Sequence, residues 1–201
     1  MQLELHTLAR LVIALIIQDE IEAERCIGLL RSSATPREKV REAILQTYLF
    51  DGYPTALEGM LKLNERWPGE VLPVEQGDFR VWEEWKSRGE ALYQAIYGDV
   101  SNRLQENARS VSPELARWMI VEGYGKVLSR PGLTILEREQ LIVAILLVKR
   151  RPRQLHSHLR GAIRVGASAD QVTHLLQAIR DLLPSGSFDD ALTLLERLIR
   201  H

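Results

Sequence analysis

The sequence has little of the chemistry that marks several specialised classes of protein. Its 201 residues contain one cysteine, Cys26, which excludes an internal disulfide and fits a reducing compartment. The net charge of -1 gives no strong attraction to nucleic acid or anionic membranes, so neither partner is expected. The apolar runs at residues 8–17 and 141–148 are too short to span a bilayer, so no membrane segment is expected either.

Several targeting and site motifs are also missing. There is no basic leader followed by a small-residue cleavage site, so we predict a cytoplasmic protein. There is no phosphate-binding glycine loop, zinc-ligand spacing or nucleophile elbow. His156 and His158 diverge on a helix because they are two residues apart, and no nearby carboxylate ligand is evident. We therefore expect no metal site and no cofactor.

The patterns that are present indicate helices. Apolar residues recur at three- and four-residue steps along nearly the whole chain, without the sustained alternation typical of strands. The sequence shows three possible capping boxes, which are motifs that begin helices. They pair Thr35 with Glu38, Thr134 with Glu137, and Ser168 with Gln171. Because hydrophobic residues make up an ordinary 45% of the chain, we predict a globular all-α fold.

Parts of the sequence repeat at an offset of 133 residues. The residues that align without gaps are Gly28 with Gly161, Arg31 with Arg164, and Thr35 with Ser168. We interpret the repeat as an internal duplication, although two amphipathic helical hairpins can also look alike by chance. The predicted organisation is a first copy at 1–67, a proline- and glycine-rich linker at 68–78, and a second copy at 79–201.

The second copy contains an ordered series of motifs, namely Arg130-Pro131-Gly132-Leu133, then Arg138-Glu139, then His158, then Gly161-Ala162. This series resembles the carboxymuconolactone decarboxylase family, which also contains the alkylhydroperoxidase-like proteins. The resemblance covers about half of the chain well, and the first copy more faintly. It implies a tandem duplicated alkylhydroperoxidase-like helical fold that forms a homo-oligomer. A homotrimer is favoured because two copies per chain would then make a six-copy ring.

The resemblance also decides which chemistry to expect. The two cysteine positions of peroxidase-type members fall on Arg151 and Gln154, while the family's glutamate and histidine are present as Glu139 and His158. Arginine and glutamine cannot act as an attacking thiolate or a resolving thiol, so thiol peroxidase activity is not expected. In the first copy Arg25 takes the place of the histidine, and we expect that copy to be catalytically empty.

Two hypotheses about function remain open. In the first, the chain is a decarboxylase-like or lactone-type lyase that acts on a small carboxylated substrate, with His158, Glu139 and Gln154 as catalytic residues. Arg151 and Arg153 would then hold the substrate carboxylate through paired hydrogen bonds. In the second, the chain is a non-catalytic oligomeric member whose degraded site binds a small molecule or only packs.

Overall fold

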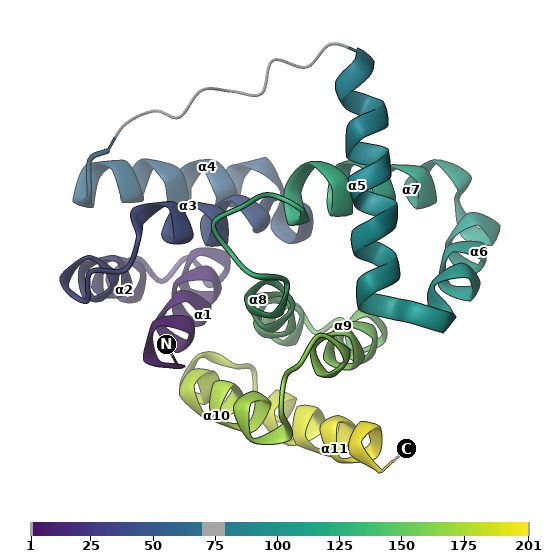
Figure 1. Ribbon diagram of the computed structural model, residues 1–201. Coiled ribbons are helices and arrows are strands. Elements are labelled where there is room, and N and C mark those ends of the chain that lie inside the picture. The colour runs from purple at the N-terminus through teal and green to yellow at the C-terminus, as the bar shows by residue number, and fades with distance from the viewer. Residues whose placement is uncertain (1, 70–78, 201) are drawn as a thin grey trace. The chain divides into compact units, whose positions relative to one another are not determined.

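The computed structural model describes residues 2–69 and 79–200, and these residues form helices joined by short turns, with no β-strand among them (Figure 1). The prediction of an all-α fold is therefore confirmed. Residues 70–78 of the predicted linker lie outside the described residues. None of the helices described is both long and apolar enough to cross a lipid bilayer. Contacts group residues 1–69 with 132–201 in one compact unit, and residues 70–131 in a second.

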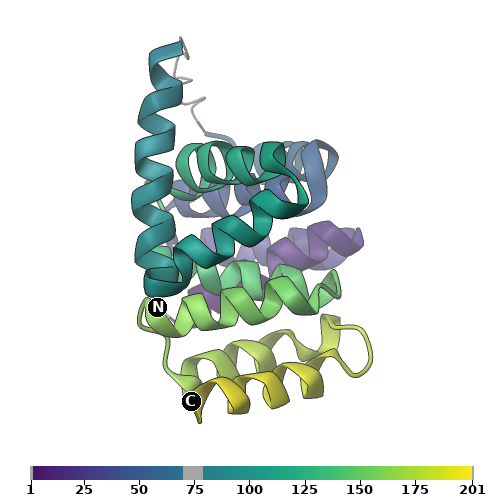
Figure 2. The ribbon, with the colours of Figure 1, turned by 90° about the vertical axis from the view of Figure 1, so that its right-hand side faces the viewer.

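The larger unit contains two sets of four helices. The first set consists of α1 (Gln2–Ile17), α2 (Glu20–Ser32), α3 (Arg37–Gln46) and α4 (Tyr48–Arg66). The second set consists of α8 (Ile135–Val148), α9 (Pro152–Arg164), α10 (Ala169–Ile179) and α11 (Ser187–Ile199). A short 3-10 helix, η3 (Arg180–Leu182), follows α10, and Figure 2 shows α10 and α11 as the yellow-green and yellow hairpin.

The helices of the two sets begin at related positions. α8, α9 and α10 begin 132 or 133 residues after α1, α2 and α3. This spacing agrees with the 133-residue offset in the sequence. The two compact units do not correspond to the two predicted copies, because both sets of helices belong to the same unit. The duplication and the copy boundaries at 1–67 and 79–201 stay predictions.

The core of the larger unit is built on α1 and α8, which pack against each other. Both helices are also covered by other helices, which explains why they are apolar on nearly every side. The helices α2, α3, α4 and α10 pack on α1, and the helices α9, α10 and α11 pack on α8. Leu8, Leu11, Leu141 and Ile145 are completely buried. Burial of each such side chain contributes roughly 1.5–3 kcal/mol to folding, so this helix pair is the main source of stability in the unit.

Helix starts agree with the sequence at two of the three predicted capping boxes. Thr134 begins α8 and Ser168 begins α10, each in a reciprocal box with the residue three positions later. The box predicted at Thr35 is wrong, because Pro36 occupies the cap position of α3 and makes no side-chain bond. The Thr35 hydroxyl instead donates to the Glu4 carboxylate of α1 at 3.2 Å. The Thr35 side chain is therefore tied to a distant helix and does not cap α3.

Helix α4 is bent near its start. Gly52 has φ +83° and ψ -179°, a backbone conformation that favours glycine, and Pro54 follows it in the first turn of the straight part. The short piece at residues 48–51 consequently brings Phe50 and Asp51 to the second set of helices, where they contact α9 and the end of α8.

The smaller unit is also helical. Its elements are α5 (Phe79–Tyr97), the 3-10 helix η1 (Gly98–Val100), α6 (Ser101–Val111), α7 (Pro113–Trp118) and the π-helix η2 (Met119–Leu128). α5 crosses the helix formed by α7 and η2 steeply (Figure 1 and Figure 2). A Cβ atom on Gly89 would lie 2.1 Å from the Ile120 carbonyl oxygen, and one on Gly125 would lie 1.9 Å from that of Trp85. Glycine therefore permits the close approach of the two backbones.

Candidate acid–base site

A carboxylate and an imidazole meet inside the larger unit. Glu139 lies in the second turn of α8, and the capping box of that helix fixes the residue at which it begins. His158 lies on α9, which begins with Pro152. The Nδ1 atom of His158 lies 2.9 Å from Oε2 of Glu139. The residues are 8% and 0% exposed, so the pair is held in a nearly dry environment. Charge-assisted hydrogen bonds are strong in such surroundings.

The second carboxylate oxygen of the pair is unusual. Glu139 Oε1 is buried and accepts no hydrogen bond from any residue that the structure describes. A buried acceptor without a donor costs about 1–3 kcal/mol, and such atoms often serve a ligand or a reaction. Glu139 therefore holds His158 with one oxygen and has acceptor capacity left on the other.

The first set of helices contributes to the surroundings of His158. The ring of Phe50, from α4, meets the imidazole edge-on, with centroids 6.3 Å apart and planes at 80°. The next residue, Asp51, forms an ion pair with Lys149 just after the end of α8 and accepts a hydrogen bond from Thr55. These contacts fix the bent start of α4 beside the site.

The other predicted site residues lie at the exposed end of α9. Gln154 is exposed, one turn before His158 on the same helix. Arg151 and Arg153 are exposed as well, and Arg151 lines a cavity of about 280 Å³ whose lining includes neither Arg153 nor His158. The structure thus brings Glu139 and His158 into contact but does not join them to the arginines. The predicted roles of all five residues stay predictions.

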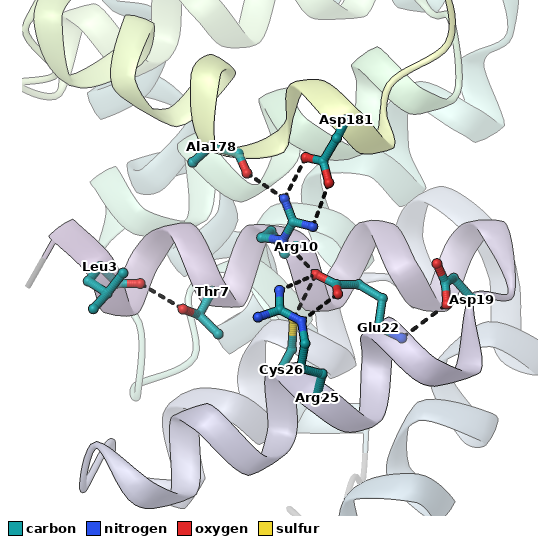
Figure 3. A network of polar contacts seen from close by, with 9 residues as sticks. All are labelled: Leu3, Thr7, Arg10, Asp19, Glu22, Arg25, Cys26, Ala178 and Asp181. Carbon is teal, nitrogen blue, oxygen red and sulfur yellow. Dashed lines mark hydrogen bonds and ion pairs between the residues drawn. The ribbon is translucent and has the colours of Figure 1, made fainter.

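The equivalent position in the first set holds a network of charges (Figure 3). Arg25, which takes the place of His158, donates to Glu22 at 2.7 Å through both Nε and Nη2. Arg10 donates to the same carboxylate at 2.5 Å and forms a bidentate pair with Asp181 at 2.6 and 2.8 Å. Arg10 also donates to the carbonyl oxygen of Ala178 at 2.7 Å, so the network ties α1 and α2 to the region around η3.

The network shifts the pKa values of its members. Hydrogen bonds from Arg25 and then Arg10 lower the pKa of Glu22 to about 2, against the opposing effect of burial. Burial, and then the Glu22 carboxylate, raise the pKa of Cys26 to about 12. Cys26 is fully buried and its thiol stays protonated near neutral pH, so it is poorly suited to nucleophilic or redox chemistry.

Sequence reasoning missed the residues that reach these positions from distant helices. Phe50 lies 108 residues before His158, and Asp181 lies 171 residues after Arg10. A local signal existed only for Glu22, which is three residues before Arg25 and four before Cys26, the spacing of neighbours on a helix. No group of three or more metal-binding side chains is arranged around a common point in the described part of the chain.

Comparison with known proteins gives distant relatives, and no family model matches the chain. The chain is 29% identical over 139 residues to peroxisomal protein 2 of Schizosaccharomyces pombe, which covers 67% of this chain and 63% of that protein. It is 26% identical over 170 residues to peroxisomal protein 2 of Saccharomyces cerevisiae, covering 72% and 59%.

A third relative is an enzyme. The chain is 31% identical over 75 residues to the 4-carboxymuconolactone decarboxylase of Acinetobacter baylyi, covering 37% of this chain and 56% of that protein. The chain therefore spans about three fifths of the length of the curated relatives it matches. These similarities are distant, and each covers only part of the two proteins compared.

Proposed function

We propose that the chain is a carboxymuconolactone decarboxylase-like protein that transfers protons on a small carboxylated substrate with His158 and Glu139. The observation that carries this proposal is the buried hydrogen bond of 2.9 Å between His158 Nδ1 and Glu139 Oε2. Similarity to a 4-carboxymuconolactone decarboxylase supports the substrate class. Thiol peroxidase activity has no support, because Arg151 and Gln154 stand at the cysteine positions and the single cysteine is elsewhere.

The pair suits a general acid or base. An ionised Glu139 can only accept, so it places the imidazole proton on Nδ1 and orients the ring, which we propose as the group that exchanges a proton with substrate. The same carboxylate stabilises the imidazolium that forms when Nε2 takes a proton. The exposed Gln154 lies one turn away on α9, from where its amide could contact the substrate.

The test is turnover of 4-carboxymuconolactone by the purified chain and by H158Q. We expect H158Q to lower turnover by about 10²-fold or more while the protein still folds, because general acid–base catalysis contributes about 10²–10⁴-fold. H156Q is the matched control, since His156 is an exposed histidine on the same helix. Equal turnover by the wild-type chain and H158Q would contradict the proposal, and so would an inactive wild-type chain.

The second candidate is a non-catalytic protein in which His158 only packs. The 8% exposure of His158 favours it. In that case H158Q lowers the melting temperature, measured by circular dichroism, and no carboxylated lactone is turned over by the wild-type chain. The same pair of proteins therefore separates the two candidates.

We also propose a homo-oligomer, with a trimer favoured. Tyr53, Leu57 and Leu61 recur at four-residue steps on α4 and are 63%, 60% and 55% exposed, which makes an apolar stripe. Analytical ultracentrifugation checks the mass of the assembly, and a monomer at micromolar concentration would exclude it. The cytoplasmic location stays a prediction, since two relatives are named as peroxisomal proteins.

A further inference from the structure

We propose that the cavity between α8, α9 and α11 binds the carboxylate of a small apolar acid through Arg150, Arg151 and Ser187. The inference deepens the proposed function and rests on it for the choice of a carboxylate among anions. The cavity has a volume of about 280 Å³, which is near the small end of ligand pockets in proteins. Leu146, Leu147 and Leu155 supply an apolar lining against which the body of such an acid can pack.

The charges at the cavity favour an anion. Arg150 and Arg151 both line it and are exposed, and neither forms an ion pair with a residue that the structure describes. Asp190 also lines the cavity with one negative charge, so the three side chains together carry a net charge of about +1. A guanidinium group presents several parallel donors and binds carboxylates with two hydrogen bonds.

Two helices begin at the same cavity without a side-chain cap. Arg151 precedes the first residue of α9, and its side chain does not cap that helix. Gly186, which has no side chain, precedes the first residue of α11. The first-turn N–H groups of a helix carry partial positive charge and have no partner within the helix. Both helices thus add to the positive potential that an anion meets at the cavity.

The cavity lining also includes a hydroxyl group. Ser187 lines the cavity and is only 8% exposed. Its hydroxyl group forms no hydrogen bond within the described residues. A hydroxyl group can donate one hydrogen bond, so a carboxylate oxygen in the cavity would accept the Ser187 proton.

The first set of helices contains an equivalent cavity that lacks these features. It also has a volume of about 280 Å³, and at the 133-residue offset Gln18 and Asp19 replace Arg151 and Pro152. The Asp19 side chain accepts the backbone N–H of Glu22 at 3.0 Å and so caps α2. Three acidic residues and one lysine line this cavity, which disfavours anions; they are Asp19, Glu20, Glu58 and Lys62. We therefore expect one carboxylate site per chain.

The experiment is isothermal titration of the full chain with benzoate and with benzamide, its uncharged analogue of nearly equal shape. Benzoate should bind at one site per chain, and benzamide should bind about tenfold more weakly or worse, because it cannot make charge-assisted bonds. R151Q should weaken benzoate binding by about tenfold or more, and S187A by several-fold. K62Q removes one positive charge from the other cavity and should leave benzoate binding unchanged.

Several results would overturn the inference. They are equal affinity for benzoate and benzamide, no benzoate binding, unchanged binding by R151Q, or an equal loss in K62Q. Inorganic phosphate that competes as well as benzoate would also overturn the assignment to a carboxylate. H158Q separates this inference from the proposed function, since benzoate binding should persist in H158Q. An inactive wild-type chain that binds benzoate through Arg151 would defeat only the proposed function.

Discussion

At the scale of single residues, two positions related by the 133-residue offset differ in the kind of charge they hold. His158 bonds to one carboxylate, Glu139, through an imidazole. Arg25 bonds to Glu22 through a guanidinium, which stays charged at every pH that a protein survives. The Arg25 position therefore holds a permanent ion pair, whereas the His158 position holds a type of side chain that serves as a general acid or base in many enzymes.

The network around Glu22 makes stability depend on pH. Because the pKa of Glu22 falls from its ordinary 4.5 to about 2 on folding, its stabilisation is fully present above pH 4.5 and disappears as the pH drops toward about 2. We expect E22Q to be less stable than the wild-type chain near neutral pH, and the difference to shrink at about pH 3. Urea unfolding at both values measures it, and a difference that grows on acidification would contradict the argument.

The thiol of Cys26 should react slowly. Burial and the Glu22 carboxylate raise its pKa to about 12, and the residue is 0% exposed, so both the thiolate and access to it are scarce. We expect iodoacetamide at about pH 8 to modify Cys26 at least tenfold more slowly in the folded chain than in urea. Mass spectrometry over time measures both rates, and similar rates would show that the thiol is accessible.

At the scale of elements, the crossing of α5 and η2 depends on two glycines, Gly89 and Gly125. A Cβ atom on Gly125 would overlap the Trp85 carbonyl oxygen, which is a backbone atom and cannot turn away. We expect G125A to lower the free energy of unfolding by about 3 kcal/mol or more, because the backbones must separate. Thermal and urea unfolding measure the change.

The same π-helix provides a matched control for that substitution. Gly123 would place its Cβ in open space, with nothing within 4 Å. We expect G123A to be neutral or to stabilise the protein slightly, since alanine favours helices over glycine by about 1 kcal/mol. An equal loss in G123A and G125A would mean that helix conformation, and not the close crossing, requires these glycines.

Elements were predictable from the sequence wherever their signals are local. Three- and four-residue apolar periods predicted helices, and the boxes at Thr134 and Ser168 predicted where two of them begin. The box at Thr35 failed because its acceptor, Glu4, lies 31 residues away and on another helix. A cap motif alone therefore did not determine which residue begins α3, where Pro36 occupies the cap position.

The candidate site also contains some contacts that were predictable from the sequence and others that were not. Glu139 and His158 were identified through the resemblance to the carboxymuconolactone decarboxylase family, and they lie in contact. Phe50 and the Arg10–Asp181 pair were not predicted, because their positions follow from how the first set packs against the second. Spacing within one helical hairpin fixes the first kind of contact, whereas the second kind requires the tertiary arrangement.

At the scale of the whole molecule, the larger unit is assembled from two segments that are distant in sequence. α1 and α8 bury each other's apolar surfaces, and charged contacts also join the segments. Arg138 of α8 donates to Glu42 of α3 at 3.0 Å, with side chains 3% and 0% exposed. Neither segment can bury its central helix without the other, so their folding should be coupled.

This coupling predicts that residues 1–69 and 132–201, expressed together as separate chains, associate in a one-to-one complex. A tag on one fragment should recover both, and circular dichroism should show more helix in the mixture than in the sum of the separate fragments. E42A in the first fragment should weaken the complex by about 3 kcal/mol, since Arg138 then loses a buried carboxylate partner. E38A is the matched control, because Glu38 is half-exposed and pairs with Arg41 within its own helix. Fragments that fold as stable separate monomers would show that each set of helices is self-sufficient.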